Sequence, residues 1–133
     1  MKKALLFVTI LFITINSFAQ SKSFDQNLTQ LMYAKNGMGP IENLTPKLVQ
    51  GISEEHKAAF ITKMNTLKIE AIKNIKDQFK KDYTNSQIIA IYSEFTSDKI
   101  NYTEETIGFF GKFRKLKGQF SKSAKELYFQ YQK

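Results

Sequence analysis

The sequence predicts an all-α protein, a small helical bundle of about five helices with one long central helix. Apolar residues recur every three or four positions along most of the chain, and no stretch alternates apolar and polar residues as a half-buried strand does. Glycine, proline and asparagine gather at a few junctions, where they are expected to separate one helix from the next. The 133 residues include no cysteine, so packing without disulfides has to hold this fold.

The first 19 residues are predicted to be a cleavable secretory signal peptide. A basic start, an apolar run and small residues before the cleavage point follow one another as Lys2 with Lys3, Ala4–Ile15, and Ser17 with Ala19. A helix over the apolar run would be about 18 Å long. An uncleaved anchor is therefore the weaker alternative, because the hydrocarbon core is roughly 30 Å thick. We expect export to the periplasm or beyond after cleavage near Ala19/Gln20, with residues 20–133 forming a single helical domain.

Two short helices are predicted at the start of this domain. The first covers about residues 24–35, and Gly37 suits the left-handed position that follows a helix. Residues 38–40, Met-Gly-Pro, are expected to be a linker. The second covers about residues 46–51, with Thr45 as its N-cap and a proline in its first turn.

The third predicted helix is long, about residues 54–81, and is expected to be central to the packing. Its apolar stripe steps by three or four residues through Phe60, Met64, Leu67, Ala71, Ile75 and Phe79. Three further residues are expected to widen this apolar face: Ile61, Ile69 and Ile72. We expect the helix to pack against the two helices that follow it, with the N-terminal helix closing one side.

The last two predicted helices begin at capping sequences. Residues 85–96 follow a Thr-x-x-Gln capping box formed by Thr84 and Gln87. The final helix begins after Thr103, and its stripe is Phe109, Phe113, Leu116, Phe120, Ala124, Leu127 and Tyr131. Three glycines weaken it: Gly108, Gly111 and Gly118. They either allow a neighbouring helix to approach closely or, at Gly118, mark a kink or break.

Part of the sequence carries a recognisable pattern of aromatic, capping and apolar residues. Its members are Phe79, Tyr83, Thr84, Ile88, Phe95 and Ser97. In this pattern the chain resembles the exported bacterial family known as domain of unknown function 2059. Asp98 and Ile100 stand where that family has proline and glycine, and residues 102–105 match the start of the motif almost as well. The resemblance implies an all-α fold and a cell-envelope location, and it implies no activity.

The sequence predicts no catalytic, cofactor or metal site. His56 is the only histidine, whereas a catalytic zinc site needs two or three His or Cys ligands. The acidic pairs Glu54–Glu55 and Glu104–Glu105 each open a helix, where a negative charge is favoured by the helix dipole. If the protein were an enzyme, the polar residues near the motif would be the first to inspect: Tyr92, Glu94 and Asp98.

The most suggestive feature is a basic run in the last helix. It contains Lys112, Arg114, Lys115, Lys117, Lys122 and Lys125, with no acidic residue between them. Loss of Lys2 and Lys3 with the signal would lower the formal net charge from +8 to +6. Such a run suits an anionic membrane surface or an envelope polymer, although it also suits a solvated face that keeps the protein in solution. Export makes nucleic acid an unexpected partner.

These observations predict a non-enzymatic interaction module of the bacterial cell envelope, acting on a protein or polymer partner that the sequence does not identify. The alternative is a basic amphipathic binder of anionic membrane or envelope polymer surfaces. The aromatic stripe of the last helix also suits burial in a homodimer.

Overall fold

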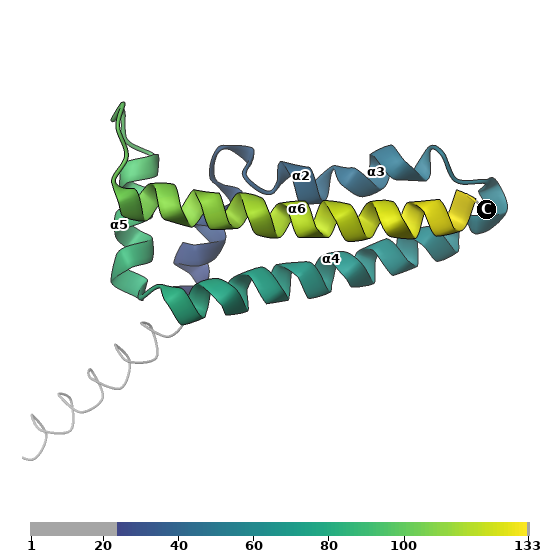
Figure 1. Cartoon of the computed structure of the whole chain (residues 1–133), viewed down its shortest axis with the longest axis horizontal. Helices are drawn as coiled ribbons and strands as arrows, with labels where there is room; N and C mark the ends of the chain where they lie inside the picture. The colour runs from purple at the N-terminus through teal and green to yellow at the C-terminus, as the bar shows by residue number, and fades with distance from the viewer. Residues whose placement is uncertain (1–23, 133) are drawn as a thin grey trace, which may run out of the picture.

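A computed structural model describes residues 24–132 and shows an all-α bundle, which confirms the predicted fold class (Figure 1). The predicted signal peptide lies outside the described residues. Residues 24–33 form the N-terminal helix. It is followed in order by the 3-10 turn η1 (Ala34–Asn36), α2 (Gly39–Glu42), α3 (Leu44–Val49), α4 (Glu54–Asp82), α5 (Asn85–Phe95) and α6 (Glu104–Gln132).

Two long helices form the frame of the bundle. α4 and α6 have 29 residues each and run antiparallel, with more contact between them than between any other pair of elements. α2 and α3 lie along one side of this pair, and α5 crosses the end opposite the C-terminus (Figure 1). α5 packs mainly on α6, whereas the sequence had suggested that it would also pack on the long third helix. The main packing partner of α4 is therefore α6, a helix of the same length.

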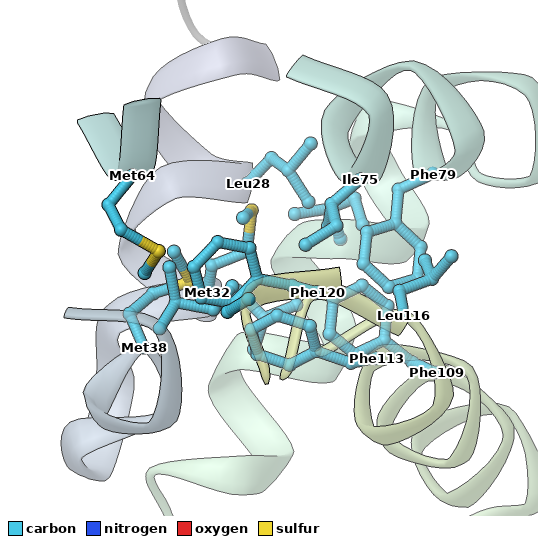
Figure 2. Close-up of a cluster of buried hydrophobic side chains, with 14 of the residues drawn as sticks. Leu28, Met32, Met38, Met64, Ile75, Phe79, Phe109, Phe113, Leu116 and Phe120 are labelled. Carbon is cyan, nitrogen blue, oxygen red and sulfur yellow. The ribbon is translucent and has the colours of Figure 1, made fainter. Parts of the chain in front are cut away.

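The two predicted stripes supply about half of the core, and the N-terminal helix, α2 and α5 supply most of the rest (Figure 2). The buried apolar residues on α4 and α6 are Phe60, Met64, Ile75, Phe79, Phe109, Phe113, Leu116, Phe120 and Ala124. The prediction that Ile61 and Ile69 widen the buried face of α4 is wrong, because their side chains are 38% and 67% exposed. Ile69 follows Phe60 by nine positions, and at about 100° per residue this places it on the opposite side of the helix. The three phenylalanines of the α6 stripe are buried within the chain, so they are not available to a dimer interface.

The predicted linker over residues 38–40 is also wrong. α2 begins at Gly39 and carries Pro40 in its first turn, where the missing N–H is not needed. Met38 and Ile41 are fully buried, so this segment supplies core residues. α3 then begins at Leu44, which places Thr45 inside the helix instead of at its N-cap.

The turn after the N-terminal helix departs from the expected glycine cap. Gly37 has an ordinary φ of −58°, and the positive φ values belong to Lys35 (50°) and Asn36 (59°). Glycine is needed at 37 for space, because a Cβ there would lie 2.3 Å from the carbonyl oxygen of Met32. The ammonium of Lys35 lies 4.5 Å from the ring centroid of Phe95, a cation–π contact that holds this turn against α5.

Four rings form an aromatic cluster where α5 joins the long helices: Phe79, Tyr83, Phe109 and Phe113. Phe79 and Phe109 stack with centroids 4.2 Å apart, and Tyr83 meets Phe109 edge-on at 5.5 Å. Such pairs add about 0.5–1.5 kcal/mol each beyond the burial of their surface. The cluster thus fixes α4 against α6 at this end of the bundle.

The predicted capping box of α5 is confirmed. The Gln87 backbone N–H donates to the Thr84 hydroxyl at 3.3 Å, and the Thr84 N–H donates to the Gln87 side chain at 2.8 Å. The chain therefore turns sharply between α4 and α5 without leaving these amide groups unpaired.

Candidate basic interface on helix α6

The six cations of the predicted basic run do not share one environment. α6 buries one side in the core, and Lys112 and Lys117 lie at the margin of that side, half-buried. The other four are exposed: Arg114, Lys115, Lys122 and Lys125. The run therefore divides into two structural lysines and four outward cations.

Lys112 and Lys117 hold other segments against α6. Lys112 forms an ion pair with Asp82, the last residue of α4. The ammonium of Lys117 donates a hydrogen bond to the carbonyl oxygen of Gly37 at 2.7 Å and lies 4.1 Å from the ring centroid of Phe113. Burial lowers the pKa of Lys117, and the nearby charge of Arg114 lowers it further. The charged groups of Lys112 and Lys117 thus contact other parts of the same chain.

The four outward cations form what we call the basic face. At about 100° per residue they fall within an arc of roughly 100° around α6, and from Arg114 to Lys125 they extend for about 16 Å along its axis. None of the four forms an ion pair within residues 24–132. Glu126 lies at the edge of this arc and is exposed, without an ion pair in the same range. The positive charge of the four cations is therefore available to an anionic partner outside the described chain.

The glycines of α6 lie on this outward side. A Cβ at Gly108, Gly111 or Gly118 would meet nothing within 4 Å, so the suggestion of a close helix–helix approach within the chain is wrong. The suggestion of a break at Gly118 is wrong too, because α6 is continuous from Glu104 to Gln132. Gly118 lies between the cations of the basic face, and Gly108 and Gly111 precede them along α6.

Two exposed apolar side chains flank the basic face and were not identified from the sequence. Ile107 is 60% exposed before it along α6, and Phe129 is 59% exposed after it. Both are apolar residues outside the buried stripe of α6, and this position is the signal in the sequence that could have revealed them. They give the outward side of α6 a mixed basic and apolar character.

The residues of the family-like motif all have structural roles. Phe79 and Tyr83 belong to the aromatic cluster, Thr84 caps α5, and Ile88 is buried. Phe95 packs on Phe110 with ring centroids 4.3 Å apart. The Ser97 hydroxyl donates to the carbonyl oxygen of Glu94 at 2.7 Å. Because these are capping and core positions, they do not test the family resemblance, which stays a prediction.

In the described chain, the side chains of the three residues named for an enzyme site form no hydrogen bond or ion pair with one another. Tyr92 packs half-buried against the core, and Asp98 is exposed in the loop before α6. Glu94 accepts hydrogen bonds from the backbone N–H and the hydroxyl of Thr103, the residue before α6. The backbone N–H bond of Thr103 is the main cause that lowers the pKa of Glu94. Glu94 thus ties the end of α5 to the start of α6.

This tie makes the stability of the fold depend on pH. Because the Glu94 pKa is lowered on folding, its carboxylate adds stability above the ordinary Glu range, and that contribution is lost as the pH falls through the lowered value. We expect Glu94→Gln to be less stable than the unmodified chain at pH 7, with the gap narrowing at pH 3. Urea unfolding at both values measures the gap.

A matched control is Glu70→Gln, which removes an exposed carboxylate that has no hydrogen bond or ion pair in the described chain. Its effect at pH 7 should be much smaller than that of Glu94→Gln. An equal gap between Glu94→Gln and the unmodified chain at pH 3 and pH 7 would contradict the role given to the Glu94 charge.

His56 lies at the far end of the bundle, at the start of α4. Its Nε2 is 3.3 Å from the Glu55 carboxylate, and its ring meets Tyr131 edge-on at 6.2 Å. Within the described part of the chain, no three His, Asp or Glu side chains are grouped so that they could hold a metal ion. None of the helices in residues 24–132 combines the length and apolar character that crossing a bilayer requires.

Comparison of the chain with protein-family models, with curated proteins and with solved structures gives no match.

Proposed function

We propose that this protein is a non-enzymatic binding module of the bacterial cell envelope, and that its basic face contacts an anionic surface. The observation that carries the proposal is the placement of Arg114, Lys115, Lys122 and Lys125 on one exposed side of α6 without ion-pair partners in the described chain. The signal peptide and the family resemblance that the sequence predicts support the envelope location. Lipid phosphates and acidic wall polymers are the anions of that compartment.

The bundle limits how such contact can occur. An isolated basic amphipathic helix inserts its apolar side into the headgroup region. In this chain the apolar side of α6 is occupied by the core, with Phe109, Phe113 and Phe120 buried. Contact must therefore be made by the outward side, through charge and the two flanking residues Ile107 and Phe129. Binding of this kind is electrostatic and is weakened by salt, because the Debye length is about 8 Å at physiological ionic strength.

The glycines favour a second candidate, a helical protein partner. Small residues let another backbone approach closely, and the space beside Gly108, Gly111 and Gly118 is open. A partner of this kind would still meet the four cations, so it would have to be acidic. The two candidates differ in what they require: a surface needs the charge, whereas a packed helix also needs the glycines.

Vesicle co-sedimentation tests the charged surface directly. A variant with glutamine at Arg114, Lys115, Lys122 and Lys125 is expected to lose binding to phosphatidylglycerol vesicles, whereas the unmodified chain binds them and not neutral phosphatidylcholine vesicles. Each basic residue near an anionic membrane contributes about 1 kcal/mol. Removing four of them should weaken binding by more than tenfold, and by up to about a thousandfold.

The control variant carries the same loss of charge elsewhere. Lys47, Lys63, Lys81 and Lys99 are exposed lysines off α6, and glutamine at all four should leave most of the binding intact. Equal losses in the two variants, or equal binding to neutral vesicles, would overturn the proposal. If alanine at the three glycines abolishes capture of an acidic protein while vesicle binding persists, the helical partner is favoured.

A further inference from the structure

A groove lies between the N-terminal helix and α4, on a different part of the molecule from the basic face. Its volume is about 520 Å³, within the roughly 300–1,000 Å³ that is usual for sites of small ligands. Its apolar lining consists of Phe24, Leu28, Ile69 and Ile72. Ile69 is one of the exposed isoleucines of the described residues, and its side chain is 67% exposed.

Charged side chains surround this apolar lining. The groove is lined by Lys73, Lys76, Lys80, Asp25 and Asp77. Lys76 is already paired with Asp25 at 3.4 Å. Lys73 and Lys80 form no ion pair within residues 24–132, and together with Asp77 they leave one net positive charge. A single negative charge on a ligand would neutralise the groove.

The groove also has a direction along α4. Ile69 and Ile72 come first, and the lysines follow toward the C-terminal end of the helix. Ile69 and Lys80 are about 16 Å apart along the axis, with Lys73 between them. An amphiphile with an acyl chain of medium length is therefore long enough to extend from the isoleucines to the lysines. An apolar ligand without a charge would leave Lys73 and Lys80 unpaired, and a cation would be repelled by them.

We propose that this groove binds one anionic amphiphile with a single acyl chain. The chain lies over Leu28, Ile69 and Ile72, and the head group, a carboxylate or a phosphodiester, lies against Lys73 and Lys80. Binding covers the exposed Ile69 side chain and pairs both free lysines. This inference does not depend on the basic face of α6 and is independent of the proposed function.

Calorimetric titration of the full chain tests the site, with ligands kept below their micelle concentrations. We expect laurate to bind with a stoichiometry close to one, and dodecanol and dodecyltrimethylammonium to bind at least tenfold more weakly. Laurate and lysophosphatidylglycerol, compared in parallel, distinguish a free fatty acid from a lysolipid by which of them binds more tightly. Binding of several laurate molecules per chain, or equal affinity for the cationic amphiphile, would overturn the proposal.

Two groove variants separate charge from apolar contact without disturbing the core. Lys73→Gln with Lys80→Gln should weaken laurate binding more than tenfold, and Ile69→Gln should weaken it severalfold; all three side chains are exposed. Glutamine at the four residues of the basic face should leave laurate binding unchanged. The groove variants should in turn keep vesicle binding, so failure of one proposal is distinguishable from failure of the other. Unchanged laurate affinity in both groove variants would place the ligand elsewhere.

Discussion

Phe109→Ala is expected to lower the free energy of unfolding by about 3–5 kcal/mol, the range for removing a buried phenylalanine side chain. Phe109 is fully buried and stacks on Phe79 at 4.2 Å, with Tyr83 edge-on at 5.5 Å. Its removal leaves a cavity where α4 and α6 meet at the α5 end, and the rings around it lose their partner. Since small domains have about 5–15 kcal/mol of stability in total, the variant should be close to unfolded at elevated temperature.

Chemical denaturation followed by circular dichroism measures this loss. Phe129→Ala is the control, because it makes the same change in the same helix at a side chain that is 59% exposed. Its effect should be within about 0.5 kcal/mol, as for most surface substitutions. A loss of similar size in both variants would contradict the assignment of Phe109 to the core.

Alanine at Gly108, Gly111 and Gly118 together is expected to raise the free energy of unfolding by about 1.5–3 kcal/mol. Glycine inside a helix is less favourable than alanine by about 0.5–1 kcal/mol, because it loses more backbone freedom on folding. None of the three has a positive φ, and a Cβ at each would meet nothing within 4 Å. The gain should appear as a higher midpoint in thermal unfolding.

Gly37→Ala supplies the contrasting control. A Cβ there would lie 2.3 Å from the Met32 carbonyl oxygen, a backbone atom that cannot move aside easily. The same change that stabilises α6 should therefore destabilise this turn. If the α6 triple variant gains no stability, the outward side of α6 is not free in solution and is packed against another molecule.

The parts of the fold that depend on neighbouring residues in the sequence could be predicted. The stripes of the two long helices follow from a spacing of three or four residues, and the Thr84 capping box needs only Gln87, three positions later. The wrong predictions concern segments where tertiary contacts or the local backbone conformation outweigh the sequence pattern. A Met-Gly-Pro sequence reads as a linker, yet Met38 and Ile41 are three positions apart and both find a place in the core. At Gly37 the sequence predicts a left-handed residue. In the structure Gly37 has a negative φ, and glycine is needed because a Cβ would clash with the Met32 carbonyl oxygen.

The basic run shows the same limit at the candidate site. Six cations in one segment look equivalent in the sequence. Lys112 finds its partner Asp82 30 residues away, and Lys117 finds the Gly37 carbonyl 80 residues away. No local pattern could identify these contacts. The structure leaves four of the six cations exposed on the outward side of α6. It also places Ile107 and Phe129 there, two residues that lie off the apolar stripe of the sequence.

The aromatic cluster at the α5 end also bears on the order in which the chain folds. Its members Phe79 and Phe109 meet across the short span of α5 and its loops, whereas Phe60 and Tyr128, in contact near the other end, are more than twice as far apart along the chain. Closing a loop of twice the length is entropically less favourable by about 0.6 kcal/mol. The short closure also brings together three buried phenylalanine rings, those of Phe79, Phe109 and Phe113. We expect α4 and α6 to form their first contacts beside α5, and the contacts nearer the C-terminus to form afterwards.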